Sequence, residues 1–491
     1  MSKFTQRNAS LFVQFEDGGI AYYLGDCADL DSIPSPQGGR EYAYCWNRDR
    51  NGHVAVARKI STPDMITFSI TELVDAAASW LEQRGKCPMN IYVLYSQCGR
   101  AGVFANWERA AIVKHAEVTN DTLSNIANHV DDNEVTHEVE FSAPPDRIDV
   151  RFPAAARLLT TETGAGTVVY SPPSYLCGSD CGKQLEEGTN WYIGTDPAAA
   201  ATAKLLVSTD GGVTWAATAA DPFGPFGVSV NINGVVVFDE SPGVRRILCA
   251  RATDAAIPCT LAYSDDNGAT WKNVGAGSTT GEFVPNPKSL IALDREHIWA
   301  GTSIGNVYFS EDGGATFTVT AAVGAFGAID VLALSAVDEN LVFGVAEADK
   351  ICFSEDGGIT WATFPATGSG ADLNALKAFS RYRILVGGAD EQLYMTMDGG
   401  TSWIAINLPG MTAGGTVKDM HFVNDLVGAV TYVNGAAAGL YAMTIDGGRT
   451  WRSVTVPTNT GLASVWMSSP NKAIATGAAV SGTAMIVGVN G

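Results

Sequence analysis

Short apolar runs separated by turn residues recur through the C-terminal two-thirds of the chain. Three examples are residues 290–310, 375–396 and 419–444, and each predicts three short strands. A polar, glycine-rich octapeptide begins at the end of each stretch. The pattern therefore predicts a β-rich domain built from one repeated supersecondary unit.

The octapeptide occurs six times with the consensus Ser/Thr-x-Asp-x-Gly-x-Thr/Ser-Trp/Phe. We expect its Asp to accept hydrogen bonds from backbone amides of its own turn, its Gly to adopt positive φ, and its aromatic residue to bury apolar area beside the next strand. This chemistry favours a structural hairpin turn over a ligand site. The residues assigned to these turns are Asp210, Gly212, Trp215, Asp266, Gly268, Trp271, Asp312, Gly314, Phe317, Asp356, Gly358, Trp361, Asp398, Gly400, Trp403, Asp446, Gly448 and Trp451.

Successive closing aromatic residues lie 42 to 56 residues apart, which suits one four-stranded sheet per repeat. After the sixth copy, residues 464–491 hold three further strands and end where a seventh copy would begin. We expect the start of the domain to supply the missing outer strand and thereby hide an exposed edge. Residues 167–171 (TVVYS) are the candidate for this closing strand.

The octapeptide resembles the Asp-box, or BNR repeat, of sialidases, sortilin-type receptors and photosystem assembly factors of the propeller class. The resemblance implies a seven-bladed Asp-box β-propeller over residues 160–491, with six or eight blades as alternatives.

Residues 1–155 differ in kind, because they contain no such octapeptide and one amphipathic helix is predicted at 70–86. A turn-rich loop is predicted at 24–52. Many strands with a single helix favour an α+β sandwich or small barrel. The whole fold is therefore expected to be mainly β, an α+β domain followed by a propeller. The predicted strands of the first domain are 10–17, 53–60, 65–71, 89–97, 110–119 and 134–143.

The N-terminal domain resembles the tube-forming proteins of long bacteriophage tails. The resemblance lies in the order of FVQFEDGG (12–19), the helix, CPMNIYVLYSQC (87–98) and the run 107–144. It implies stacked, hexameric rings with DNA passing through the lumen without specific binding. The alternative is a β-rich oligomerisation or adaptor domain of another kind.

The net charge of −21 excludes proteins that grip phosphates and is compatible with a conduit that repels DNA mildly. Asp131, Asp132 and Glu134 form an acidic cluster, although such a run is by default a solvated loop.

These features predict a virion structural protein, a tail tube subunit with an outward-projecting propeller. Its partners would be other copies of itself and a host-surface glycan or protein, without membrane insertion. It would be located in the virion tail and assembled in the host cytoplasm. The alternatives are a cytoplasmic assembly or scaffold factor that binds a partner through the propeller face, and a sialidase-like glycoside hydrolase.

The hydrolase alternative is the weakest on sequence. Residues 151–153 (Arg-Phe-Pro) only approximate the Arg-Ile-Pro motif of sialidases, and Arg246, Arg295 and Arg383 follow no shared pattern, which favours surface positions. The sequence therefore indicates a protein that is not an enzyme, with no catalytic, cofactor-binding or metal-binding residue.

Nine cysteines are an odd number, which argues against a complete disulfide framework. Cys177 and Cys181 form a C-x3-C loop, and Cys249 and Cys259 flank a predicted hairpin. Buried free thiols are the favoured interpretation of both pairs, and the alternative is that Cys249 and Cys259 face each other across the hairpin. The sequence contains no apolar run typical of a signal peptide or a membrane span.

Overall fold

The chain divides into two compact units, Met1–Phe152 and Pro153–Asn490, in a computed structural model. The sequence-based ranges were 1–155 and 160–491. The structure describes residues 9–15, 21–29, 40–47, 52–59, 64–70, 88–95, 104, 107–121, 137–143, 147–153, 155–158, 165–170, 190–196, 205–224, 232–241, 244–251, 260–274, 286–320, 323–456, 461–480 and 483–490.

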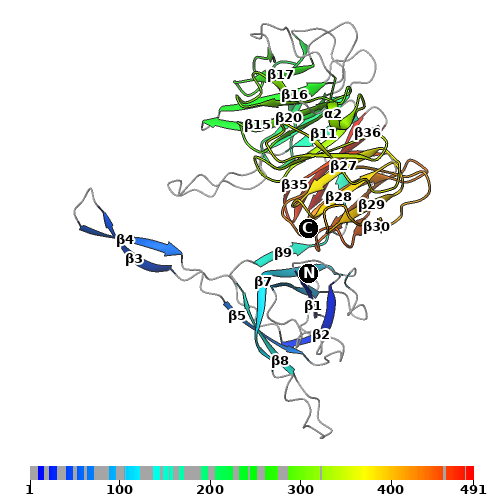
Figure 1. The fold of residues 1–491 in the computed structure, drawn as a ribbon. Helices are drawn as coiled ribbons and strands as arrows, with labels where there is room; N and C mark the ends of the chain where they lie inside the picture. Colours follow the sequence, from blue (N-terminus) through cyan, green and yellow to red (C-terminus); the bar gives the residue numbers. More distant parts are fainter. Residues whose placement is uncertain are drawn as a thin grey trace. The chain divides into compact units, whose positions relative to one another are not determined.

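Six strands of the N-terminal unit close into an antiparallel barrel (Figure 1). The strands pair in the order β6-β1-β2-β5-β8-β7, and β7 pairs again with β6, so this ring of strands has no first or last member. A further strand, β9, pairs with the first part of β7. The bounds are β1 (Ala9–Phe15), β2 (Tyr22–Asp29), β5 (Asp64–Ile70), β6 (Met89–Tyr95), β7 (Arg109–Asp121), β8 (His137–Ala143) and β9 (Arg147–Arg151).

Both faces of the barrel wall are buried at β1, β6 and β7. Consecutive residues such as Leu11, Phe12 and Val13 are all at most 3% exposed, although neighbours in a strand point to opposite faces. Continuous apolar runs are typical of strands covered on both sides. This part of the barrel is therefore packed from inside and from outside.

The remaining two strands of this unit, β3 (Arg40–Asn47) and β4 (Gly52–Lys59), form a separate two-stranded sheet. The prediction of a loop over 24–52 is wrong, because this stretch contains most of β2 and all of β3. The reason is that polar and turn-forming residues interrupt the alternation of apolar and polar positions by which a strand is recognised in a sequence. The predicted helix lies outside the described residues except for Ile70, which ends β5. The cluster of Asp131, Asp132 and Glu134 also lies outside them.

The C-terminal unit contains seven four-stranded antiparallel sheets in its described part. We number them from first to seventh in chain order of their inner strands. They are β11 (Ala165–Tyr170), β12 (Trp191–Asp196), β13 (Leu205–Ser208) and β14 (Ala216–Ala217); β15 (Ile232–Ser241), β16 (Val244–Arg251), β17 (Leu261–Ser264) and β18 (Lys272–Asn273); β19 (Pro287–Ala292), β20 (Ile298–Thr302), β21 (Val307–Ser310) and β22 (Thr318–Val319); β23 (Val331–Ala336), β24 (Val342–Ala346), β25 (Lys350–Ser354) and β26 (Ala362–Phe364); β27 (Leu373–Ala378), β28 (Ile384–Gly388), β29 (Gln392–Thr396) and β30 (Ile404–Asn407); β31 (Thr416–Phe422), β32 (Gly428–Val433), β33 (Gly439–Thr444) and β34 (Arg452–Val454); and β35 (Leu462–Ser469), β36 (Lys472–Val480), β37 (Thr483–Asn490) and β10 (Arg157–Leu158). A four-residue helix, α2 (Val323–Phe326), precedes the fourth sheet.

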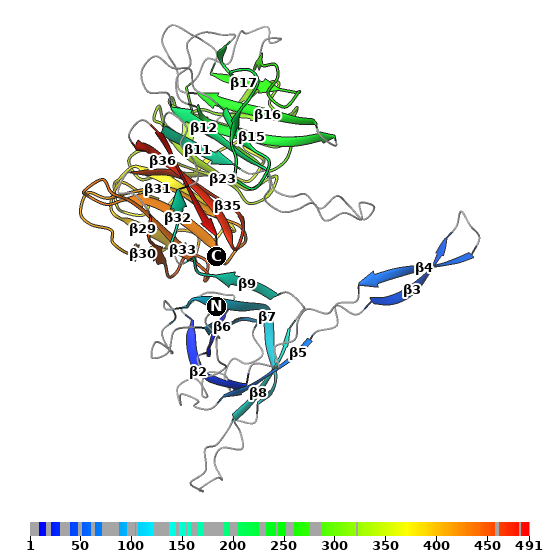
Figure 2. The ribbon, with the colours of Figure 1, turned by 180° about the vertical axis from the view of Figure 1, so that it is seen from behind.

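The seven sheets are arranged in a ring. Their inner strands contact one another in the cyclic order β11, β15, β19, β23, β27, β31, β35 and back to β11. Figures 1 and 2 show sheets of this unit packed beside one another, seen from two opposite directions. Sheets that radiate in this way from a shared set of inner strands are the architecture of a β-propeller.

The ring is closed by a strand from its N-terminal end, but the expected strand was the wrong one. Residues 167–171 largely coincide with β11, which is the inner strand of the first sheet and already pairs with β12. The outer strand of the seventh sheet is β10, in which Arg157 pairs with Gly488 and Leu158 with Val487. A two-residue strand is too short to show alternation, so its sequence carried no signal.

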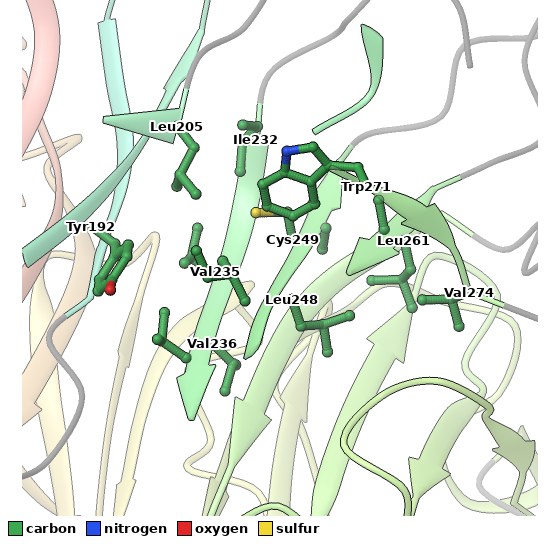
Figure 3. Close-up of a cluster of buried hydrophobic side chains, with 14 of the residues drawn as sticks. Tyr192, Leu205, Ile232, Val235, Val236, Leu248, Cys249, Leu261, Trp271 and Val274 are labelled. Atoms are coloured by element: carbon green, nitrogen blue, oxygen red, sulfur yellow. The ribbon is translucent and has the colours of Figure 1, made fainter. Parts of the chain in front are cut away.

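The core lies between neighbouring sheets. Figure 3 shows one cluster, in which Trp271 of the second sheet packs near Cys249 and Leu261, while Tyr192 and Leu205 approach from the first. Cys249 is a free, buried thiol. This confirms the favoured interpretation of Cys249 as a buried free thiol. The alternative, in which it faces Cys259 across the hairpin, is wrong, because Cys249 pairs in register with Ala262. Cys177, Cys181 and Cys259 lie outside the described residues.

We expect the fragment 160–491 to aggregate and to melt at a lower temperature than the fragment 153–491. The two differ by seven residues that include β10, and losing β10 leaves one edge of β37 unpaired. Solubility and thermal melts of both fragments test this. Equal behaviour would show that β10 does not close the ring.

Candidate functional site

Each octapeptide forms a turn between the third and fourth strands of one sheet, and the first copy illustrates its geometry. Asp210 Oδ1 accepts hydrogen bonds from the backbone N–H of Thr214 (2.9 Å) and from the hydroxyl of Ser208 (2.8 Å). The Ser208 hydroxyl in turn accepts the N–H of Gly212 at 2.8 Å. One carboxylate and one hydroxyl thus satisfy several polar groups of a tight turn.

The same bonds recur in all six copies. The residue four positions after each Asp donates its N–H and its hydroxyl to the carboxylate, and the Ser or Thr two positions before donates a third bond. The motif glycines have φ between 79° and 96°. The carboxylates so engaged belong to Asp210, Asp266, Asp312, Asp356, Asp398 and Asp446.

The residue before each motif glycine also has positive φ, which the sequence consensus did not mark. Five of these residues are glycines, and the sixth, Asn267, has φ 60°. Asn tolerates the left-handed conformation better than most residues, so the second copy keeps the turn without this glycine.

These bonds hold the carboxylates of Asp210 and Asp398 in their charged form. Hydrogen bonds from the Thr214 hydroxyl and amide lower the pKa of Asp210, and those from the Ser402 hydroxyl and amide lower the pKa of Asp398. Their oxygens are engaged within the turn, which supports the structural interpretation of the motif over a ligand-binding one.

Four of the six aromatic residues that close the turns donate an indole N–H to a backbone carbonyl. Trp215, Trp361 and Trp451 donate their indole N–H to the carbonyl of their own motif glycine. Trp271 instead donates to Ala220 O, which comes from the preceding sheet. Phe317 packs against the core cluster of the second sheet, and Trp403 packs at the edge of the core formed by the fourth and fifth sheets.

Side chains from one sheet reach the octapeptide turn of the next, and the sequence reasoning missed them. Arg246 Nη1 donates to Asp312 O, Trp299 Nε1 to Gly357 O and Arg383 Nη2 to Gly447 O, each at 2.8 Å. We call these three side chains the inter-sheet latches. A repeated Arg-Ile-Leu sequence, at 246–248 and 383–385, was the available signal for two of them.

The expectation that Arg246 lies on the surface is wrong, because its side chain is buried (6% exposed). Its guanidinium lies over the Tyr263 ring at 4.4 Å, and its Nε is 3.1 Å from Asp265. Arg295 is exposed and approaches Arg246 around Gly313, whereas Arg383 serves another pair of sheets. The structure therefore brings together only two of the three arginines considered for a sialidase site.

A second set of bonds joins the inner strands to one another. The N–H groups of Ala378, Val465 and Met467 are accepted by side chains of the preceding sheet. The acceptors are Ser335 Oγ (3.1 Å), Asp419 Oδ2 (3.0 Å) and His421 Nδ1 (3.1 Å). Inner strands have one edge without a neighbouring strand, so these side chains satisfy amides that the sheet leaves unpaired.

Burial shifts the pKa values of Asp419 and His421, the two titratable acceptors in this set. It raises the pKa of Asp419 to about 6, against hydrogen bonds from Ser464, Val465 and Met420 that lower it. Burial, together with the charge of Lys377, lowers the pKa of His421 to about 3. His421 is therefore neutral at pH 7, which leaves Nδ1 free to accept a hydrogen bond.

The described residues contain no group of three His, Cys, Asp or Glu side chains that could hold a metal ion. Among the same residues, no helix is long and apolar enough to cross a membrane.

No protein-family model matches this chain, and no curated protein sequence matches it. Solved structures resemble this chain over part of its length. YCF48 from Cyanidioschyzon merolae shares 14% identity at a TM-score of 0.48, covering 69% of this chain and 99% of that one. The RRP9 WD40 repeats share 10% identity at 0.48, covering 70% and 100%, and the GH74 xyloglucanase from Xanthomonas campestris shares 13% at 0.46, covering 68% and 55%. The assignment of a β-propeller rests on the cyclic contacts of the sheets themselves.

We expect Asp356→Ala to destabilise the propeller by about 1–3 kcal/mol, because the N–H of Thr360 and two hydroxyls lose their acceptor. Chemical denaturation of the full chain measures it. Glu355→Ala in the same turn is the matched control. That residue is exposed and, among the described residues, forms an ion pair with Arg381 alone, so its loss should cost less than about 1 kcal/mol. Equal losses in both variants would contradict the role given to the motif Asp.

His421 should make the protein less stable as the pH falls below 6.5. The unfolded chain takes up a proton there, whereas folded His421 does so only near pH 3. Asp419 acts in the opposite direction, since its raised pKa favours the folded state at low pH and this contribution is lost above about pH 6. His421→Asn keeps an acceptor that does not titrate.

The measurement is the free energy of unfolding of wild type and His421→Asn at pH 7.5 and pH 5. The free energy of unfolding of the wild type should exceed that of the variant at pH 7.5, and this difference should disappear at pH 5. A difference that is the same at both pH values contradicts the assignment.

Proposed function

We propose that this chain is a structural protein of a virion, a tail tube subunit. The N-terminal unit assembles into rings that conduct DNA, and the C-terminal unit is a seven-bladed Asp-box propeller displayed as decoration. The seven sheets in cyclic contact and the six octapeptide turns support the account of the propeller.

The observation that carries the assembly role is the isolated hairpin β3–β4. Its strands pair only with each other, and among the described elements neither makes substantial contact with a third. A lone two-stranded hairpin is marginally stable in water. The proposal accounts for it, because a neighbouring subunit in the ring would cover it.

The register of the hairpin supports this account. Tyr42, Tyr44 and Trp46 occupy alternate positions of β3, and their partners on β4 are Ala57, Ala55 and His53. The intervening positions pair Ala43 with Val56 and Cys45 with Val54. Both sets are mostly apolar by residue type, which is unusual for a hairpin meant to face water.

The propeller itself is poorly suited to polymerise through strand pairing. Its outer strands are two to four residues long, as in β14, β18, β22 and β10 with two and β30 with four. Short outer strands resist edge-to-edge association. Assembly is therefore assigned to the N-terminal unit.

The net charge of −21 supports a conduit through which DNA slides without being held. The proposal is also a non-enzymatic one. Arg246 and Arg383, two of the three arginines considered for a sialidase-type carboxylate clamp, are engaged as latches.

A scaffold role is the second candidate. It is favoured by Ile359 and Tyr382, which are 65% and 64% exposed beside the octapeptide turns and would suit a protein partner.

We expect the full chain to form rings or tubes visible by negative-stain electron microscopy, and the fragment 1–152 to do the same. Replacing residues 39–60 by a short Gly-Ser linker should abolish assembly while leaving the circular dichroism of the barrel unchanged. Asp356→Ala is the matched control and should leave assembly intact, because it alters only the propeller. A full chain that sediments as a monomer at high concentration would overturn the virion role and leave the scaffold role.

A further inference from the structure

Lys377, His421 and Trp466 occupy equivalent positions on three successive inner strands. Each is the third paired residue after the bulge of its strand, opposite Leu385, Ala429 and Ile474 respectively. The inner strands β27, β31 and β35 contact one another in this order. The three side chains therefore follow one another along the inside of the ring, and each is only partly buried.

The hydrogen bonding of His421 fixes which nitrogen carries its proton. Nδ1 accepts the N–H of Met467, so the neutral ring bears its hydrogen on Nε2. The ring stacks on Trp466 with centroids 3.8 Å apart and planes at 28°, which holds its orientation. In the described part of the chain, Nε2–H has no acceptor.

Lys377 places an uncompensated charge beside this donor. Its Nζ lies 5.7 Å from the centre of the Phe379 ring, and among the described residues it has neither a hydrogen bond nor an ion pair. Lys377 and His421 lie near each other because they occupy equivalent positions on the contacting strands β27 and β31. Burial lowers the pKa of Lys377, and the charge of Lys377 contributes to lowering the pKa of His421. Asp419 is the nearest carboxylate along the strand, but its Oδ2 accepts from Ser464 and Val465.

A charged ammonium and an N–H donor that have no acceptor among the described residues favour a ligand that supplies negative charge and acceptor atoms to this partly buried site. We propose that Lys377 and His421 bind a carboxylate on the inside of the propeller ring. One carboxylate oxygen would accept from Nζ and the other from Nε2–H, since a single carboxyl group offers two acceptors side by side.

The chemical class follows from the number and charge of the donors. One positive charge with one neutral donor matches a monoanion, and the strongly acidic chain disfavours polyanions. The carboxylate belongs either to a small organic acid or to the end of a peptide, and the experiment separates these sources.

The test uses the full chain and thermal melts in acetate against chloride at equal ionic strength, with a short peptide bearing a free or an amidated C-terminus in parallel. A saturable rise in melting temperature with acetate identifies a small acid. A rise with the free-acid peptide alone identifies a peptide. No rise with either, or a rise with phosphate only, overturns the proposal.

Variants assign the effect to the site. Lys377→Met should abolish the carboxylate-dependent rise without lowering the melting temperature in chloride, because it removes an uncompensated charge. His421→Phe should weaken binding about tenfold, the loss of one hydrogen bond to a charged group. Lys418→Met, an exposed lysine on the same strand β31, is the matched control and should keep the rise. An unchanged rise in Lys377→Met overturns the site.

If Lys377→Met does not fold, the wild type still decides the question. The NMR signal of the Lys377 side chain, in protein labelled at lysine, should shift on titration with the carboxylate that binds. A signal that does not move at saturation overturns the proposal.

Discussion

The propeller depends on a carboxylate that satisfies its own turn. Each octapeptide makes two successive residues adopt positive φ, a conformation that leaves amides without strand partners, and the motif Asp and its neighbouring hydroxyl accept those amides. Because the turn is then rigid, its carbonyls stand at fixed points. The latches Arg246, Trp299 and Arg383 use these carbonyls to join one sheet to the next. The hydrogen bonds within each turn thereby position the acceptors that join neighbouring sheets of the ring.

Features that arise within one turn could be predicted from sequence, and features that arise between sheets could not. The octapeptide specifies its hydrogen bonds over eight residues, so six turns and the strands that flank them were predictable. The closing strand β10 has two residues and is recognised only by its pairing with β37. Likewise, β2 and β3 lie in a stretch rich in turn-forming residues, which hides the alternation of apolar and polar residues even though their partners β1 and β4 are neighbours along the chain.

The polar acceptors on the inner strands could not be predicted from the sequence either, for a chemical reason. An unpaired amide needs an acceptor, but a Ser, an Asp and a His all serve, as Ser335, Asp419 and His421 do. No consensus can therefore mark the position. At the position equivalent to His421, β27 carries Lys377, which provides a charge rather than an acceptor.

The short connection between the two units has a mechanical consequence. Phe152 donates its N–H to Glu108 O in the barrel, and Ala156 donates its N–H to Thr455 O in the propeller, so only a few residues separate two anchored points. The strand that follows at once is β10, held to β37 through two residue pairs. Tension transmitted along the chain from barrel to propeller is carried first by the strand that closes the ring. A force strong enough to detach β10 from β37 opens the ring at the seventh sheet before any complete sheet unfolds.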